Sequence, residues 1–215
     1  MSDGDPERSA REDRRDRRRA DRRRSILEAA RAQLLDGGIA EFEISKVAAR
    51  ADVSKASVYY YFDSKEELIS DMAADSIRAE VEILSAAIDE HGDGVDALVA
   101  MIQAYVKYYG EDLSRFRLVY FWPQVLGIQQ RVLTGSVYPL VAELNDRLEQ
   151  KLIATRDAGG LVSDAHPRKL ANLAWVTAQG LVSLAAGMEA VGGSTRFSLD
   201  ELCEEACRSF WRARA

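Results

Sequence analysis

The sequence predicts an all-α protein of about nine helices, with a three-helix helix-turn-helix domain at the N-terminus and a larger helical domain after it. Apolar residues recur at helical spacing along most of the 215-residue chain, and the chain contains only four prolines. Two short apolar stripes between Ile44 and Phe62 are separated by a turn of a few residues. Two short helices joined so tightly cross at a steep angle, which is the helix-turn-helix unit.

Composition limits the class of protein. With two cysteines and no apolar leader, a secreted disulfide scaffold is not expected. No stretch approaches the roughly 20 apolar residues that a membrane span needs, so we expect a cytoplasmic protein with no membrane partner. Cys203 and Cys207 lie four residues apart; a redox or metal role is open, and small buried hydrophobes at an interface are the alternative. His91 and His166 are interpreted as residues next to helix ends, not as metal ligands.

Charge is unevenly distributed along the chain. The net charge is −6, but residues 1–65 carry 15 Lys and Arg against 13 Asp and Glu, which is +2. The remaining residues carry 14 against 22, which is −8. This asymmetry places a nucleic-acid-binding face near the N-terminus.

Residues 1–20 are polar and rich in arginine, and they have too few apolar side chains to fold alone. Between Arg8 and Arg24 there are ten arginines and four acidic residues. We expect a flexible arm that lies along phosphates or enters a minor groove. The alternatives are a solvated tail or a helical extension with internal ion pairs.

The next segment predicts three helices and the start of a fourth. The three are expected at residues 21–36, 44–51 and 55–62. The buried stripe of the first comprises Ile26, Leu27, Ala30, Leu34 and Leu35. Gly37 and Gly38 end that helix by providing a left-handed residue. Ser64 then begins the fourth helix as its N-cap, and Glu67 completes a capping box.

This segment resembles the DNA-binding signature of the TetR (tetracycline-repressor-like) family of bacterial transcription regulators. The matching residues are Val47-Ala48, Ala51, Val53-Ser54-Lys55, Tyr59-Tyr60-Tyr61-Phe62 and Ser64-Lys65-Glu66-Glu67-Leu68, with Ile26-Leu27-Glu28-Ala29-Ala30 and Gly38 upstream. The resemblance implies three regions: an arm at 1–20, a helix-turn-helix DNA-binding domain at 21–67, and a ligand-binding and dimerisation domain at 68–215. It covers about residues 24–70.

The resemblance also implies which residues meet DNA. Small or hydrogen-bonding side chains on the outer side of the third helix suit base edges and phosphates in a major groove. The candidate DNA-binding residues are Arg23, Arg24, Ser45, Lys55, Ala56, Ser57, Tyr59, Tyr60, Tyr61 and Lys65. For Tyr59 packing alone is the alternative role. Lys65 is expected to favour a phosphate because it lies at a helix N-terminus.

The sequence departs from the family pattern at two positions. Asp52 replaces the usual glycine of the turn, where the backbone is expected to be left-handed, a conformation that Asp tolerates better than most residues. Glu43 replaces the usual Ser or Thr at the N-cap of the second helix. A carboxylate there would repel a phosphate, so Ser45 is expected to make the backbone contact instead.

The rest of the chain predicts further long helices. They are expected from Ser64 to about His91, over 95–109, over the aromatic stretch 113–122 that Pro123 closes, over 135–157, from Asp164 to Val191, and from the Ser198–Glu201 capping box to Trp211. Aromatic richness indicates either simple core or the lining of a ligand cavity. The candidate ligand-binding residues are Met101, Tyr105, Tyr109, Phe116, Tyr120, Phe121, Trp122, Trp175 and Gln179.

The helix predicted to end at Val191 is apolar on nearly all sides, so it must be buried, and the chain has too few other helices to bury it. A two-fold dimer in which the last two helices of each subunit form a four-helix bundle is the economical solution, and the resemblance implies the same. The candidate dimerisation residues are Leu173, Val176, Leu181, Leu184, Met188, Leu202 and Phe210.

Together these patterns favour a ligand-responsive transcription regulator, by analogy a repressor. It would bind a palindromic double-stranded DNA operator as a homodimer and be released by a small hydrophobic effector, in the cytoplasm and associated with the nucleoid. The alternative is a DNA-bound structural or interaction protein of the same fold that recruits a protein partner and senses no small molecule. No nucleophile–base pair, metal-ligand cluster or phosphate loop is evident, so we expect no enzyme activity, no metal and no cofactor.

Overall fold

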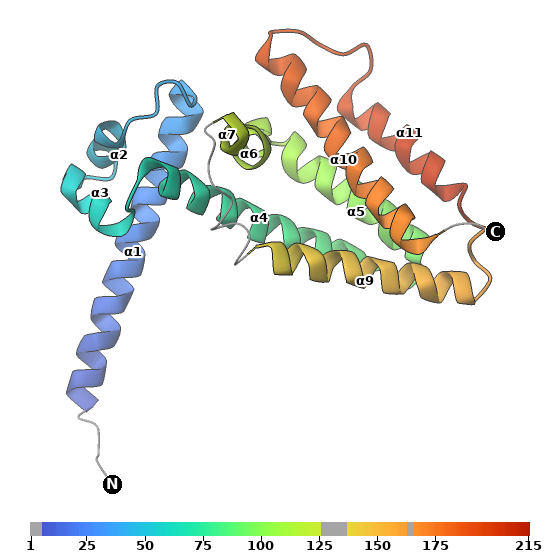
Figure 1. Ribbon diagram of the computed structural model, residues 1–215, viewed down its shortest axis with the longest axis horizontal. Coiled ribbons are helices and arrows are strands. Elements are labelled where there is room, and N and C mark those ends of the chain that lie inside the picture. The colour runs from blue at the N-terminus through green and yellow to red at the C-terminus, as the bar shows by residue number, and fades with distance from the viewer. Residues whose placement is uncertain (1–5, 126–136, 163–165) are drawn as a thin grey trace. The chain divides into compact units, whose positions relative to one another are not determined.

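The computed structural model describes residues 6–125, 137–162 and 166–215, with side chains from residue 13 onward (Figure 1). The chain divides into two compact units, Met1–Met72 and Ala73–Ala215. Helices α6, η1 and α7 follow one another without a break, so the described residues form nine separate helical segments. The all-α prediction is confirmed, and the expected start at Gly135 and the expected cap at Asp164 lie outside the described residues.

In the first unit, helix α1 (Pro6–Gly37) is longer than the sequence predicted. It begins at Pro6 and not at Asp21, so the helical-extension alternative describes the backbone of residues 6–20. Arginine is a good helix former, and Asp21 pairs with Arg24 one turn later at 3.9 Å. Leu35 was wrongly assigned to the buried stripe: it is 52% exposed, because it lies about 100° around the helix from buried Leu34.

Helices α2 (Ile44–Arg50) and α3 (Lys55–Tyr61) pack on α1 around one small core. Its buried residues include Ile26, Ala30, Leu34, Val47, Ala48, Val58 and Phe62. The turn between the two helices is a Schellman motif, in which the Val53 N–H donates to the Ala48 carbonyl at 3.0 Å. Asp52 has φ of 52°, so the predicted left-handed residue is confirmed.

Side-chain caps fix where α3 and α4 (Lys65–Asp89) begin. Ser54 Oγ accepts from the Ser57 N–H at 3.0 Å. Ser64 Oγ accepts from the Glu67 N–H at 3.0 Å, as expected of an N-cap. The Glu67 carboxylate accepts a hydrogen bond from the N–H of Asp63, one residue before the N-cap. The capping box is therefore shifted by one residue from the predicted pattern.

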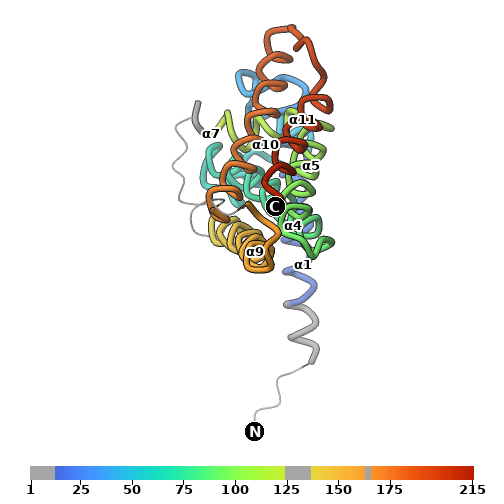
Figure 2. The backbone as a smooth tube through the Cα atoms, turned by 90° about the vertical axis from the view of Figure 1, so that its right-hand side faces the viewer, coloured from blue at the N-terminus to red at the C-terminus, as the bar shows by residue number. Residues whose placement is uncertain are grey.

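In the second unit, helix α5 (Gly94–Gly110) lies at the centre and is in contact with α9 (Tyr138–Asp157), α10 (Pro167–Ala190) and α11 (Leu199–Trp211) (Figure 2). Gly94 allows a close approach, since a Cβ there would lie 2.7 Å from the backbone of Leu152. The Gly94 N–H donates to Thr155 Oγ1 at 2.7 Å. The predicted Ser198–Glu201 capping box of α11 is confirmed.

The aromatic stretch forms three short helical pieces in succession, α6 (Leu113–Phe116), the π-helix η1 (Arg117–Phe121) and α7 (Trp122–Val125). Pro123 was predicted to close the stretch, but helix continues through it to Val125. π-helical turns are rare and occur frequently at functional sites. Among the described helices of the second unit, this stretch is the one that contains a π-helical segment.

Helix α10 has two different apolar faces. The buried face is made of small residues, among them Ala171, Ala174, Ala178, Val182 and Ala186. The opposite face exposes Leu173 and Val176, each 55% exposed, and Leu184. By length and composition α10 could also cross a membrane, with a mean hydropathy of 1.2 and 28% of that window buried. The core helix of a globular protein passes the same test.

Candidate functional site

The outer side of α3 carries residues that were predicted from the sequence to bind DNA. Lys55, Ala56, Tyr59 and Tyr60 are exposed, and the Tyr60 side chain is 70% exposed. Ser57 is half-buried, and its hydroxyl lies 2.8 Å from Ser54 Oγ. Tyr59 lies outside the core, with Lys55 Nζ 6.0 Å from its ring centroid. Donors and small groups thus lie together on one accessible helix face.

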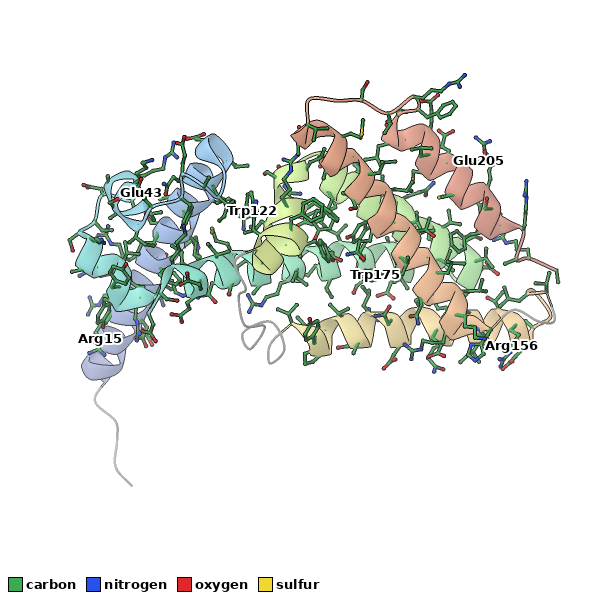
Figure 3. All side chains as sticks on the ribbon, turned by 45° about the horizontal axis from the view of Figure 1, so that its top comes forward. Arg15, Glu43, Trp122, Arg156, Trp175 and Glu205 are labelled. Atoms are coloured by element: carbon green, nitrogen blue, oxygen red, sulfur yellow. The ribbon has the colours of Figure 1, made fainter. Side chains whose placement is uncertain are left out.

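A cleft rich in arginine lies beside this face. It has a volume of about 630 Å³ and is lined by Arg15, Arg18, Arg19, Asp21, Arg22, Ser25, Tyr60 and Tyr61. Figure 3 shows Arg15 on the N-terminal half of α1. The Arg19 guanidinium lies 5.8 Å from the ring centroid of Tyr60, so α1 and α3 contact each other through these two side chains. Four arginines against one aspartate make the cleft electropositive, which suits a phosphate chain.

Two predicted arginines of α1 have different surroundings. Arg23 is bonded to Asp71, and its guanidinium lies 5.1 Å from the ring centroid of Phe62. Arg24 is 71% exposed, and among the described residues it forms a weak pair with Asp21. Of the two, Arg24 is the more available to a ligand in solution.

Lys65 and Ser45 are engaged within the domain. Lys65 Nζ donates to the Phe42 carbonyl at 2.8 Å and lies 5.3 Å from the Phe42 ring centroid. The Ser45 hydroxyl donates to Glu43 Oε2 at 3.1 Å, and this bond is the largest cause of the lowered pKa of Glu43. Glu43 is the N-cap of α2 but makes no side-chain cap bond. A contact from Lys65 or Ser45 to a phosphate would have to compete with these bonds.

In the second unit, five of the predicted ligand-binding residues form one aromatic cluster: Tyr105, Tyr109, Phe116, Tyr120 and Phe121. The ring centroid of Tyr109 lies 4.9 Å from that of Tyr105, 5.5 Å from that of Phe116 and 6.0 Å from that of Tyr120. Phe116 and Phe121 are in edge contact at 5.5 Å. Buried Met101 and half-buried Trp175 pack in the same core, and Figure 3 labels Trp175 on α10. Trp122 and Gln179 are half-buried.

The cluster contains a residue that the sequence reasoning missed. Glu80 of α4 is 3% exposed, and its Oε2 accepts from the Tyr109 hydroxyl at 2.5 Å and from the Tyr120 hydroxyl at 3.4 Å. Burial raises the pKa of Glu80 to about 7, and the two hydrogen bonds only partly oppose this. The signal was its position between Met72, Leu84 and Ile88, at multiples of four residues on the buried stripe.

The predicted dimerisation residues fall into three groups. Leu173, Val176 and Leu184 are exposed. Leu181, Met188 and Leu202 are half-buried. Phe210 is 8% exposed and belongs to the core of its own subunit, because its face of α11 packs on α5.

Comparison with known proteins places the first unit. Residues 26–72 match the family model for the N-terminal region of bacterial regulatory proteins of the tetR family. The chain carries a TetR-family DNA-binding domain. Over 64 residues it is 41% identical to an uncharacterized HTH-type transcriptional regulator of Mycobacterium tuberculosis, and this match covers 30% of each chain. The chain therefore matches less than a third of the length of its curated relatives.

Solved structures resemble nearly the whole chain. A protein of unknown function from Rhodococcus sp. RHA1 has a TM-score of 0.71 at 22% identity, over 90% of this chain and 95% of that one. FadR from Bacillus subtilis, solved with stearoyl-CoA, has a TM-score of 0.68 at 16% identity, over 88% of this chain and 97% of that one. The TetR-family regulator PfmR from Thermus thermophilus has a TM-score of 0.67 at 16% identity, over 87% of this chain and 97% of that one. At these identities the likeness establishes the fold.

Proposed function

We propose that this protein is a ligand-responsive transcriptional repressor that binds a palindromic DNA operator as a homodimer. The observation that carries the proposal is the exposed face of α3 beside the arginine-lined cleft of α1, within a TetR-family domain. The face offers Lys55 to base edges and the Tyr60 hydroxyl to a phosphate, and the cleft offers arginines to further phosphates. The DNA-binding residues named from the sequence are proposed in these roles.

The exposed face of α10 supports the homodimer. Leu173, Val176 and Leu184 leave a large apolar surface in water, and a second copy of the chain would cover it. A Cβ at Gly180 or Gly187 would meet nothing within 4 Å, so the backbone is accessible to close packing by another helix. A dimer would present two recognition helices to two half-sites.

The aromatic cluster supports an effector site in the body. Its residues come from α4, α5, α6 and η1, and helix α4 begins in the DNA-binding domain at Lys65. A ligand that separates these elements would shift α4 and change the spacing of the two recognition helices. An effector needs to favour the non-binding state by only a few kcal/mol to empty an operator.

Selection from random DNA tests the proposal. The purified protein is incubated with a pool of randomised duplexes, and bound duplexes are sequenced after several rounds. We expect a two-fold symmetric motif, bound as a dimer in sedimentation velocity, with an affinity that falls steeply with salt. Enrichment of no motif would contradict an operator-binding function.

The alternative of a DNA-bound protein that recruits a protein partner shares the same DNA interface. Screening small molecules for release of the selected duplex separates the two. Release by a compound that binds the body supports the repressor, whereas a body that binds no compound supports the partner-recruiting alternative.

A further inference from the structure

A buried glutamate such as Glu80 destabilises the core of a helical domain when its carboxylate is ionised. It is 3% exposed, and in the described part of the chain no lysine, arginine or histidine pairs with it. A carboxylate buried without a counter-ion costs several kcal/mol when it is ionised. Its hydrogen bonds come only from the neutral hydroxyls of Tyr109 and Tyr120.

A second polar atom in the same cluster is incompletely satisfied. The hydroxyl of Tyr105 is buried, makes no hydrogen bond of normal geometry within the described residues, and interacts with the hydroxyl of Tyr120. Tyr105 is 0% exposed, and its ring lies 4.9 Å from that of Tyr109, the residue that bonds Glu80. Buried hydroxyls almost always make well-formed hydrogen bonds, so a hydroxyl without one beside an unpaired carboxylate can still accept a bond from a further polar group.

The surrounding rings suit a cation. Tyr105, Tyr109, Phe116 and Tyr120 contact one another with centroids 4.9 to 6.0 Å apart. Aromatic faces attract ammonium groups, and more strongly where water is excluded. The cluster therefore places a carboxylate next to aromatic rings, the two kinds of group that bind amines and quaternary ammonium groups.

The cluster also has an element that can admit a ligand. Tyr120 is half-buried and lies on the π-helix η1. The Arg117 guanidinium holds η1 to α10 through the Ala186 carbonyl at 3.1 Å and through Glu189. A small shift of η1 would move the Tyr120 ring away from Glu80 without unfolding α5.

We propose that Glu80, with Tyr105, Tyr109 and Tyr120, binds the cationic head of the effector, an amine or quaternary ammonium group that carries an apolar body. This rests on the proposed function, because it names the chemical class of that effector. The cation supplies the charge that Glu80 lacks, and the Tyr105 hydroxyl accepts a hydrogen bond from an amine head. A carboxylate or phosphate head would meet Glu80 with no cation to balance either charge, so anionic acyl compounds are excluded.

Three probes with one apolar body and different heads test the proposal by calorimetry. They are phenylbutylamine, phenylbutanol and phenylbutyrate. At about pH 8 we expect the amine to bind on the order of tenfold or more tighter than the alcohol, and the acid most weakly. Glu80→Gln keeps the size and removes the charge, and it should abolish the preference for the amine. Glu82→Gln on the exposed side of the same helix is the matched control and should change nothing.

The pH dependence tests the same site in the unaltered protein. The amine stays charged throughout, so its affinity should fall about tenfold per unit of pH below about 7, where Glu80 becomes protonated, and level off above it. Phenylbutanol should show no such slope. Equal binding of amine and alcohol, or a flat pH profile for the amine, would overturn the proposal.

Release of DNA separates this inference from the proposed function. If the amine binds through Glu80 but leaves the operator complex intact, the cation site stands and the effector role fails. If phenylbutanol or phenylbutyrate releases the operator and the amine does not, the repressor proposal stands and the cation site is overturned.

Discussion

The buried carboxylate of Glu80 should make the stability of the body depend on pH in an unusual direction. Its pKa rises from an ordinary value of 4.5 to about 7 in the folded protein. Between these values the folded state binds one proton more than the unfolded state, so stability falls as pH rises from 4.5 to about 7 and then levels. Linkage gives a loss of roughly 2–3 kcal/mol between about pH 5 and about pH 8. Most paired carboxylates show the opposite trend.

Glu80→Gln removes the carboxyl group that titrates, so it should remove the loss of stability between about pH 5 and about pH 8. The free energy of unfolding is measured by urea denaturation, at one protein concentration, for both proteins at both pH values. Other groups titrate equally in the two proteins, so the difference between them isolates Glu80. We expect the variant to gain roughly 2–3 kcal/mol relative to the parent on going from about pH 5 to about pH 8. A difference that does not change with pH would mean that Glu80 has an ordinary pKa and is not buried in solution.

The remaining predictions concern the turn, the DNA interface and the exposed face of α10. Asp52→Gly should stabilise the protein by up to about 1 kcal/mol by removing left-handed strain, and a lower melting temperature would refute this. Lys55→Ala should alter the preference of the protein among DNA duplexes, whereas Lys65→Ala should weaken binding to all duplexes equally. Lys65→Ala should also lower stability by about 1 kcal/mol, because the variant loses the hydrogen bond to the Phe42 carbonyl. Competition of the selected duplex against random DNA distinguishes the two variants. Leu173→Glu should dissociate the dimer in sedimentation velocity, and Val191→Glu at the helix end is the control that should remain a dimer. If both variants remain dimers, the interface lies elsewhere.

Local rules predicted the first domain well. The turn at Asp52, the N-cap at Ser64 and the burial of Val58 and Phe62 each follow from a few neighbouring residues, and the structure has them where the sequence places them. Tyr59, which was assigned to the same apolar stripe, is 44% exposed. The start of α1 was wrong, because a low apolar content shows that a segment has no core to bury but does not exclude an isolated charged helix.

Features that depend on contacts between distant segments were harder to predict. Lys65 at a helix N-terminus was assigned to phosphate, yet its ammonium donates to the carbonyl of Phe42, 23 residues earlier. Phe210 was assigned to the dimer interface, yet it is buried by α5. Periodicity identifies the apolar side of a helix, but it does not tell whether the same chain or a second copy covers that side.

Glu80 and the π-helix η1 are both departures from what favours stability alone. A leucine at position 80 would continue the stripe of Met72, Leu84 and Ile88 without the cost of burying a charge. A regular α-helix would hold Tyr120 with better backbone hydrogen bonds than a π-helix provides. The two departures meet at one hydrogen bond, from the Tyr120 hydroxyl to Glu80. Sequences that are locally consistent elsewhere break such rules chiefly at functional sites, so their coincidence favours a site that binds a ligand over a core that merely tolerates two defects.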